Sequence, residues 1–277
     1  MNNTNEIKAG EPLVVFDNVH LGFDEGEVLR GISFQIAANE TKILLGESGS
    51  GKTLLLKLAA GLIRPDSGRI WVMGHEVGEM TETQLLDFRR RIGFVFQEGA
   101  LFDSMSVEDN VAFRLHEENI APEEIEERVH EALRFVEMED AIGKFPSELS
   151  GGMRRRVSIA RALVDRPTMV LYDSPTAGLD PVTSQTIITL IMRLRDSQGV
   201  TSTVVTNRLQ DAFGLANFRF DSKSNRVIRL PKNGARGDVH PTNVLVLRAG
   251  EIYFQDATDA LLNTSDPYLK QFLASAQ

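Results

Sequence analysis

Cysteine is absent from the 277-residue sequence. Its absence excludes disulfide bonds, cysteine-ligated zinc sites and thiol catalysis, and it is consistent with a reducing cytoplasm. Runs of about 18 apolar residues are absent as well, so we expect no membrane-spanning helix, and any membrane role must come through a partner. The polar segment 1–11 lacks the apolar core of a signal peptide, and we expect a polar tail there.

A basic excess is also missing. The formal net charge is −9, whereas nucleic-acid-binding surfaces favour a basic balance, so we expect no nucleic-acid partner. We interpret the arginine runs at 89–91 and 154–156 as solvated helix faces. The five histidines show no metal-ligand spacing. The remaining composition, 42% hydrophobic and 25% charged, is that of a globular protein with a full core.

The most informative feature that is present is the glycine-rich octet at 46–53, GESGSGKT. Its spacing, G-x-x-x-x-G-K-[ST], is that of a phosphate-binding loop. An apolar run at 43–45 precedes it and a helix-like stretch at 54–60 follows, which is the context that the motif requires. Glycines let the backbone curl so that several N–H groups face one anion, above the positive end of the helix dipole. An ordinary glycine-rich turn is the alternative, and the flanking strand and helix disfavour it.

The loop predicts a nucleoside triphosphate and Mg²⁺ as cofactors. Lys52 is expected to reach the β- and γ-phosphates, and the Thr53 hydroxyl to bind Mg²⁺. The residues expected to contact the phosphates are Gly46, Glu47, Ser48, Gly49, Ser50, Gly51, Lys52 and Thr53.

Periodicity along the chain predicts an α/β fold with a largely parallel sheet. Residues 107–163 read mostly as helix, and we expect a helical subdomain over about 98–164. Short β-rich runs are expected at 13–19, 32–36, 41–45, 69–73, 92–96, 169–172 and 203–205, with a hairpin from 244–247 and 251–254. The polar, basic stretch 221–243 predicts a surface loop, either merely solvated or in contact with phospholipid headgroups or an acidic partner.

Two further motifs bear on phosphate chemistry. Ser150, Gly151 and Gly152 open a predicted helix and form a second anion cradle, which is a weak signal by itself. The apolar run from 168 ends in Asp173, and a buried strand of this kind delivers a carboxylate to the sheet edge beside the phosphate loop, where Mg²⁺ needs a hard oxygen ligand. The residues Ala-Gly-Leu-Asp follow at 177–180.

Taken in order from about 13 to 254, these motifs resemble the nucleotide-binding subunit of ATP-binding cassette (ABC) transporters. The resemblance identifies 46–53 as Walker A and Ser150, Gly151 and Gly152 as part of the family signature. It implies further roles: Phe23 stacks on adenine, Gln97 approaches Mg²⁺ and senses the membrane partner, Asp173 is the Walker B aspartate that binds Mg²⁺, and Asp180 belongs to the D-loop.

The resemblance also implies an architecture and partners. It predicts a P-loop NTPase core with an antiparallel β N-terminal subdomain and the inserted helical subdomain, as one domain over 12–277 with a C-terminal tail from about 257. Two cassettes, of like or unlike chains, meet head to tail, and each ATP lies between Walker A of one and the signature of the other. Closure pulls on transmembrane permease subunits, so the chain is expected in the cytoplasm, at the inner face of the inner membrane. The stretches 96–102 and 146–156 are most similar to the ATPases of Mla/Mce systems, which move phospholipids or other lipids.

Two positions depart from the family pattern, and both affect hydrolysis. The family has Glu after the Walker B aspartate, to orient the attacking water, and a switch His after strand 203–205; this chain has Ser174 and Asn207. A serine hydroxyl cannot accept a proton near neutral pH as a carboxylate does, and loss of a positioned base costs roughly 10²–10⁴-fold in rate. Asn207 can still donate an N–H to a phosphate oxygen, but it carries no charge.

Three interpretations of these changes stay open: slow turnover as a switch or clamp, pairing with a competent cassette, or another group that positions the water. Two other function classes also remain, namely a soluble ABC ATPase of an assembly or scaffold system and a regulatory ATP-binding module without catalysis. Ser174 and Asn207 favour the last of these.

Overall fold

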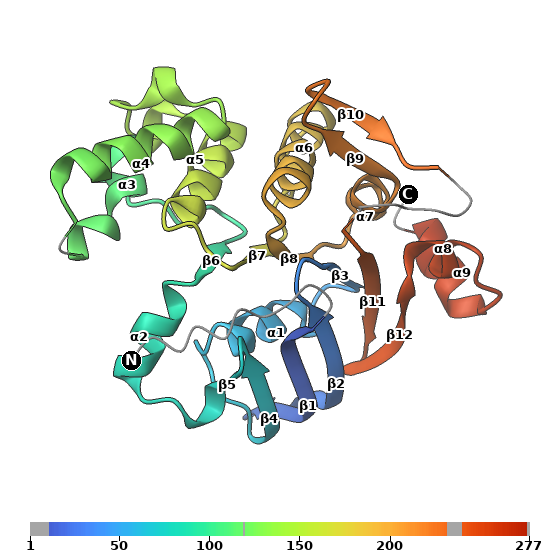
Figure 1. Cartoon of the computed structure of the whole chain (residues 1–277). Helices are drawn as coiled ribbons and strands as arrows, with labels where there is room; N and C mark the ends of the chain where they lie inside the picture. The colour runs from blue at the N-terminus through green and yellow to red at the C-terminus, as the bar shows by residue number, and fades with distance from the viewer. Residues whose placement is uncertain (1–10, 119, 232–239, 276–277) are drawn as a thin grey trace.

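The structure is a computed structural model that describes residues 11–118, 120–231 and 240–275. Its centre is a six-stranded sheet of order β12-β11-β3-β8-β7-β6 (Figure 1). The five strands from β11 to β6 are parallel, and β12 is antiparallel at the edge. The strands are β3 (Thr41–Gly46), β6 (Ile92–Val95), β7 (Met169–Asp173), β8 (Thr201–Val205), β11 (Thr242–Arg248) and β12 (Glu251–Ala257).

The central sheet is buried on both faces. Every residue of β3, β7 and β8 is buried, as expected for parallel strands covered on both sides. Side chains of β3 alternate between two cores: Ile43 and Leu45 join one, and Leu44 joins the other. The central sheet therefore lies between two layers, each with its own hydrophobic core.

One layer contains a second, antiparallel sheet of order β2-β1-β4-β5 and helix α1 (Lys52–Ala59). Its strands are β1 (Pro12–Phe23), β2 (Gly26–Ala37), β4 (Ser67–Val72) and β5 (His75–Glu76). Helix α2 (Glu82–Arg89) begins at a capping box. The Thr81 side chain accepts a hydrogen bond from the Gln84 N–H, and the Gln84 side chain accepts one from the Thr81 N–H. This layer is the expected β-rich N-terminal subdomain.

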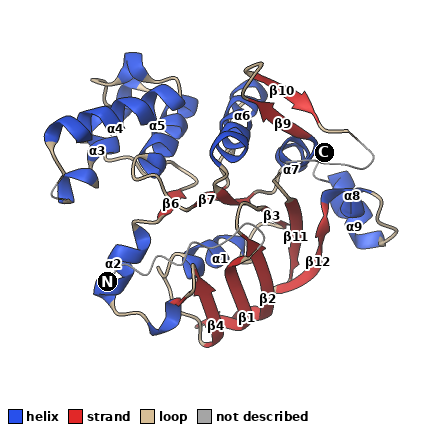
Figure 2. Ribbon diagram, viewed as in Figure 1, coloured by secondary structure: helices blue, strands red, loops and turns tan. Residues whose placement is uncertain are grey.

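The other layer includes the helical subdomain, formed by α3 (Val107–Ala112), α4 (Pro122–Phe135) and α5 (Gly151–Leu163) and grouped apart from the sheets in Figure 2. Sequence signals set the helix starts: Ser106 caps α3, Pro122 opens α4 and Ser150 caps α5. Single 3₁₀ turns lie at Val77–Glu79, Leu115–Glu117, Glu139–Ala141 and Pro146–Glu148. The predicted fold class is confirmed.

The expected loop at 221–243 is in part a hairpin, which corrects the sequence interpretation. Strands β9 (Phe218–Asp221) and β10 (Arg226–Arg229) pair antiparallel next to α6 (Pro181–Gln198) and α7 (Leu209–Asn217). Phe220 and Val227 lie opposite each other and pack on the core, so alternating apolar residues outweighed the polar, turn-forming ones. Residues 232–239 lie outside the described residues.

The segment expected as a C-terminal tail contains two helices, α8 (Thr258–Leu262) and α9 (Pro267–Ser275), which lie beside β11 and β12 (Figure 1). Leu261, Leu269 and Phe272 enter the core. Within the described residues, no helix combines the length and apolar character needed to cross a bilayer.

A buried arginine joins the elements around α6. Arg195 is 0% exposed, and its guanidinium donates to the Leu215 and Phe218 carbonyls and forms a bidentate pair with Asp196. One side chain therefore connects α6 to α7 and β9. Guanidinium is suited to this role because its planar fork satisfies several acceptors at once.

We predict that Arg195→Ala lowers the free energy of unfolding by about 3–5 kcal/mol, because it leaves the Asp196 carboxylate and two carbonyls without their partner. The matched control is Arg166→Ala, whose side chain is 70% exposed in its pair with Glu131 and should contribute at most about 1 kcal/mol. Urea unfolding followed by circular dichroism compares them, and equal losses would contradict the prediction.

Candidate functional site

The glycine-rich loop is held between two neighbouring strands. Gly46 ends β3 with φ 150°, and a Cβ there would lie 2.5 Å from the Leu247 carbonyl oxygen of β11. Gly51, at φ 98°, precedes α1, and a Cβ there would lie 2.6 Å from Leu29 of β2. Both glycines are required by close approach and by backbone conformation. The two ends of the loop are therefore packed closely against β11 and β2.

Lys52 lies inside this curl. Its side chain is mostly buried, and its Nζ donates to the Gly46 carbonyl at 2.9 Å and the Glu47 carbonyl at 2.7 Å, with the Ser50 hydroxyl at 3.2 Å. Burial lowers the pKa of Lys52, and the charges of Asp173 and Glu47 partly oppose that shift. An anion bound in the loop would favour the protonated, charged form of Lys52 and so oppose the effect of burial on its pKa.

An oxygen pair suited to Mg²⁺ lies at the end of β7. The Thr53 hydroxyl donates to Asp173 Oδ1 at 3.0 Å, and the Ser174 hydroxyl approaches the same oxygen at 3.3 Å. A hydroxyl beside a carboxylate is the hard-oxygen set that Mg²⁺ uses together with phosphates. Across the described part of the chain, no group of three or more His, Asp or Glu is placed to hold a metal ion by itself. The residues thus fit Mg²⁺ that arrives with a nucleotide.

A cavity of about 310 Å³ opens onto the loop. Its lining joins four separated segments of the chain and contains no carboxylate among the described residues: Ser48, Gly49, Gly51, Lys52, Thr53, Leu54, Gln97, Ser174, Ala177, Val205 and Asn207. The fold thereby brings Gln97, Ser174 and Asn207, whose positions the resemblance assigns to the nucleotide site, to the same cavity as the loop.

Ser174 and Asn207 are held by a shared network behind the cavity. The Ser174 N–H donates to the Val205 carbonyl at 2.9 Å, and its φ of 48° lies in the left-handed region, which is uncommon for serine. Asp211 of α7 accepts hydrogen bonds from the hydroxyls of Thr176 and Thr206, one on each of the two loops. Asp211 was not predicted; its only signal is a carboxylate within an apolar helix.

The second anion cradle lies elsewhere. Ser150 caps α5 by accepting from the Met153 N–H at 3.3 Å, and Ser150 and Gly151 are exposed. A Cβ at Gly152 would lie 2.3 Å from Thr183, so that glycine is needed for helix packing. None of the three lines the phosphate cavity. This separation is the one expected of a cradle that serves a second chain.

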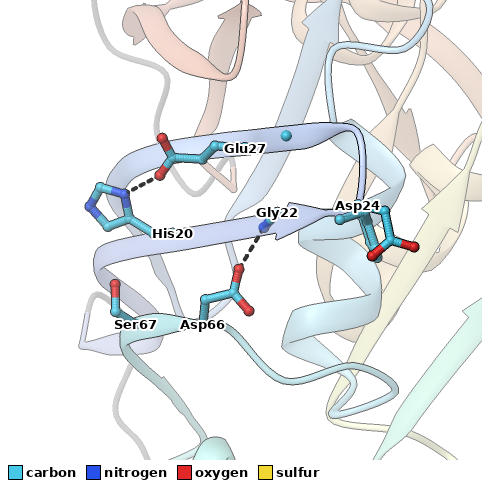
Figure 3. A pocket seen from close by; sticks show the side chains of 8 residues that line it. His20, Gly22, Asp24, Glu27, Asp66 and Ser67 are labelled. Carbon is cyan, nitrogen blue, oxygen red and sulfur yellow. Dashed lines mark hydrogen bonds and ion pairs between the residues drawn. The ribbon is translucent and has the colours of Figure 1, made fainter.

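Phe23 and Asp180 also lie apart from the loop residues. Phe23 is 57% exposed and lines an open cavity of about 850 Å³, shown in Figure 3, where His20 pairs with Glu27 at 2.6 Å. Asp180 caps α6, accepting from the Val182 and Thr183 N–H groups at 3.0 Å. Hydrogen bonds from Thr183 lower the pKa of Asp180.

The arginine run at 154–156 is not simply a solvated face, which corrects that interpretation. Arg155 is only 6% exposed, and its Nη1 donates to the Phe96 carbonyl at 2.7 Å. The sequence could not show this, because a long guanidinium side chain can turn inward when buried carbonyls lack partners. Arg154 is exposed and Arg156 is half-buried.

The C-terminal helix reaches the phosphate loop, which the sequence analysis missed. The Tyr268 hydroxyl lies 3.3 Å from Glu47 Oε1, and the Arg248 guanidinium lies 3.9 Å from the centre of the Tyr268 ring. Burial raises the pKa of Tyr268, and Glu47 adds to that shift. The apolar residues of α9 were the only sequence signal that this helix packs on the rest of the molecule.

These features define a P-loop nucleotide-binding cassette, and comparison with known proteins agrees. The family model described as "ABC transporter" matches residues 29–177, more than half of the chain, and the chain belongs to this family. A solved structure of the ATP-binding cassette MJ0796, dimeric and bound to ADP and Pi, is similar with a TM-score of 0.74 and 27% identity, over 88% of this chain and 98% of that one.

Curated relatives carry different transport names. The methionine import ATP-binding protein MetN of Rhizobium johnstonii is 37% identical over 76% of this chain, which spans only 58% of that relative's length. The protein TRIGALACTOSYLDIACYLGLYCEROL 3 of Arabidopsis thaliana is 33% identical over 94% of this chain and 73% of its own length. The intermembrane phospholipid transport system ATP-binding protein MlaF of Haemophilus influenzae is 35% identical over 76% of this chain and 80% of its own.

The Asp211 network predicts a pH-dependent stability difference. Burial raises the pKa of the Asp211 carboxyl above its ordinary 3.8, against the lowering effect of the Thr176 and Thr206 hydroxyls. The native state then holds its proton longer than the unfolded chain, so this residue's contribution to stability falls as pH rises from below 3.8 through the folded pKa. We predict that wild type loses stability relative to Asp211→Asn over that rise.

Urea unfolding across a pH series measures this difference. Asp221→Asn is the control with the opposite sign, because Ser224 lowers the pKa of the exposed Asp221 carboxyl. The quantity compared is the free energy of unfolding of wild type minus that of Asp211→Asn. If this difference stays constant or increases with pH, burial does not raise the pKa of the Asp211 carboxyl.

Proposed function

We propose that this chain is the ATP-binding subunit of an ABC transporter, in which ATP-driven dimer closure is coupled to a membrane permease. One observation carries the proposal: Lys52 and Thr53 line a single cavity of about 310 Å³ at the curled loop, and the Thr53 hydroxyl donates to the Asp173 carboxylate next to that lining. These are the groups that a triphosphate tail and Mg²⁺ require.

The chain's own residues bind ATP by exchanging partners. Lys52 transfers its hydrogen bonds from the Gly46 and Glu47 carbonyls to the β- and γ-phosphates, while the loop N–H groups and the N-terminus of α1 face the same charge. Thr53, Asp173 and Gln97 would hold Mg²⁺, which would neutralise phosphate charge. The exposed ring of Phe23 stacks on the adenine.

Hydrolysis at this chain's own site is impaired. No carboxylate lines the described part of the cavity, and the Ser174 hydroxyl is directed to Asp173 rather than presenting a base to water. Asn207 supplies an uncharged amide at the switch position. ATP therefore binds and closes the dimer, but reopening is slow. This favours a second candidate, a regulatory ATP-binding module, over a soluble assembly or scaffold ATPase.

A second cassette completes the site. The Ser150–Gly152 cradle lies outside the phosphate cavity of its own chain, and the similar MJ0796 cassette was solved as a dimer. The partner is a second copy of this chain or an unlike cassette. An unlike cassette that keeps the catalytic glutamate and histidine would hydrolyse ATP only at the site formed by its own Walker A. Head-to-tail pairing places each cradle over the other chain's ATP.

The substrate is a lipid, most simply a phospholipid moved across the bacterial envelope. The stretches 96–102 and 146–156, which resemble Mla/Mce ATPases, support this assignment, and relatives whose names concern phospholipid transport or a galactolipid match this chain. The share of a relative's own length does not separate the substrates, because the sulfate/thiosulfate import relative CysA of Chlorella vulgaris matches over 96% of its length. The Arabidopsis relative also aligns with 94% of this chain. Import of methionine or sulfate, named for other relatives, is the competing assignment.

The permease docks on an apolar groove of about 470 Å³ next to the segment that follows Gln97. Phe102 and Phe113, 41% and 38% exposed, line this groove, and their tilted rings lie with centres 4.6 Å apart. Exposed, contiguous aromatic surface of this kind indicates a protein interface. Docking there keeps the chain peripheral, at the inner face of the inner membrane.

Calorimetry with Mg·ATP tests binding, and phosphate release tests turnover. We expect wild type to bind, and Lys52→Ala to weaken affinity roughly 10–100-fold, because charge-assisted hydrogen bonds contribute about 1.5–3 kcal/mol. Turnover should be slow, and Ser174→Glu with Asn207→His should raise it by roughly 10²-fold or more. Absence of Mg·ATP affinity in folded protein contradicts the proposed function; rapid wild-type turnover that Lys52→Ala abolishes contradicts only the impaired site.

Copurification from membranes tests the docking groove and the transport class. We expect Phe102→Asp to release the chain from its permease, because a carboxylate in an apolar interface is costly to desolvate. Leu262→Asp, at an equally exposed position in α8, is the matched control and should leave the complex intact. Copurification with a soluble complex alone argues for an assembly ATPase instead.

A further inference from the structure

Two arginines on α5 hold the segment that follows Gln97. Arg155 Nη1 donates to the Phe96 carbonyl at 2.7 Å, and its Nη2 approaches the Ala177 carbonyl at 3.5 Å. One and a half turns later, Arg161 donates to the Gly99 and Ala100 carbonyls at 2.9 and 2.8 Å. The turn from 96 to 100 is therefore bonded to one helix at both ends, through the carbonyl oxygens of Phe96, Gly99 and Ala100.

These contacts connect the two cavities already described. Gln97 and Ala177 line the phosphate cavity, whereas Ala100 and Arg161 line the apolar groove. Phe96, whose carbonyl binds Arg155, also lines the groove. Arg161 additionally lies 5.8 Å from the centre of the Phe102 ring, which also lines the groove. Arg155 thus contacts Ala177, which lines the phosphate cavity, whereas Arg161 itself lines the groove.

Among the three consecutive arginines, only Arg155 reaches outside the helical subdomain. Arg154 donates to the Leu149 carbonyl just before its own helix, and Arg156 donates to the Val136 and Glu137 carbonyls after α4. Arg155 is also the most buried of the three, at 6% exposed. Burial lowers the pKa of Arg155, and the charges of Asp173 and Glu98 oppose that shift.

The turn is held in an uncommon conformation. Gly99 and Ala100 have φ values of 81° and 48°, and the second is unusual for a residue with a side chain. The turn therefore combines an uncommon backbone conformation with hydrogen bonds at both of its ends. The helix that binds it begins at Ser150, so the same rigid element carries the second anion cradle.

We propose that Arg155 is a positioning residue that couples the phosphate cavity to the permease groove, by binding the start of the 96–100 turn and the Ala177 loop to α5. Nucleotide that displaces Gln97 or Ala177 moves α5 through Arg155, and Arg161 moves with it at the groove. The inference rests on the proposed function in taking the 310 Å³ cavity as the ATP site and the 470 Å³ groove as the permease site.

Hydrogen–deuterium exchange with and without Mg·ATP tests this coupling. In wild type we expect altered exchange at two places, the phosphate loop (46–53) and the groove segment (97–103). In Arg155→Met, Mg·ATP affinity should stay within about threefold of wild type and the phosphate-loop response should remain. The groove response should be lost, because methionine fills the volume without donating to either carbonyl.

Two further variants separate positioning from general destabilisation. Arg155→Lys keeps one donor and should restore part of the groove response. Arg154→Met, on the adjacent residue of the same helix, should respond as wild type does. Thermal unfolding of all three variants checks that the helical subdomain is folded.

The outcomes are distinguishable. A groove response in Arg155→Met equal to that of wild type overturns the inference, as does wild-type protein that binds Mg·ATP without any groove response. Wild-type protein without Mg·ATP affinity overturns the proposed function and this inference with it. A response lost equally in Arg154→Met would show a structural effect of the helix and also overturns the role of Arg155.

Discussion

The structure depends on one constraint, the close packing that keeps the 46–53 loop curled between β2 and β11. Gly46 and Gly51 meet neighbouring strands at distances that leave no space for a side chain, so the loop cannot relax without moving the sheet. The curl in turn buries the Lys52 ammonium against carbonyl oxygens. A cation held in this way can exchange neutral carbonyl acceptors for phosphate oxygens, which form stronger, charge-assisted hydrogen bonds.

The two anion cradles and the apolar groove, to which the proposed function assigns different ligands, lie on different parts of the fold. The phosphate cavity lies at the carboxyl ends of β3, β7 and β8, where parallel strands deliver polar side chains to one edge. The signature cradle lies on the helical subdomain instead. Because Arg155 bonds that subdomain to both loops of the cavity, binding and docking can influence each other without a direct contact between their ligands.

Much of the fold and part of the site could be predicted from the sequence, because they depend on local patterns. Apolar runs predicted most of the strands, helical spacing predicted a mostly helical stretch over 107–163, and glycine spacing predicted the loop. The β9–β10 hairpin was misread because polar residues outnumber apolar ones over 218–229, and the prolines at 231 and 241 lie just beyond it. Arg155 was misread because side-chain direction depends on which carbonyls the fold leaves without partners.

The sequence by itself determined which chemical groups are available: a lysine and a threonine after a glycine loop, a carboxylate after an apolar strand, and Ser174 and Asn207 in place of a base and a switch histidine. Only the tertiary structure decided which of them meet. It joined Gln97, Ser174 and Asn207 at one cavity and kept the Ser150 cradle out of it. The physical reason is that contacts between distant segments follow from sheet order and helix packing, which no local sequence pattern specifies.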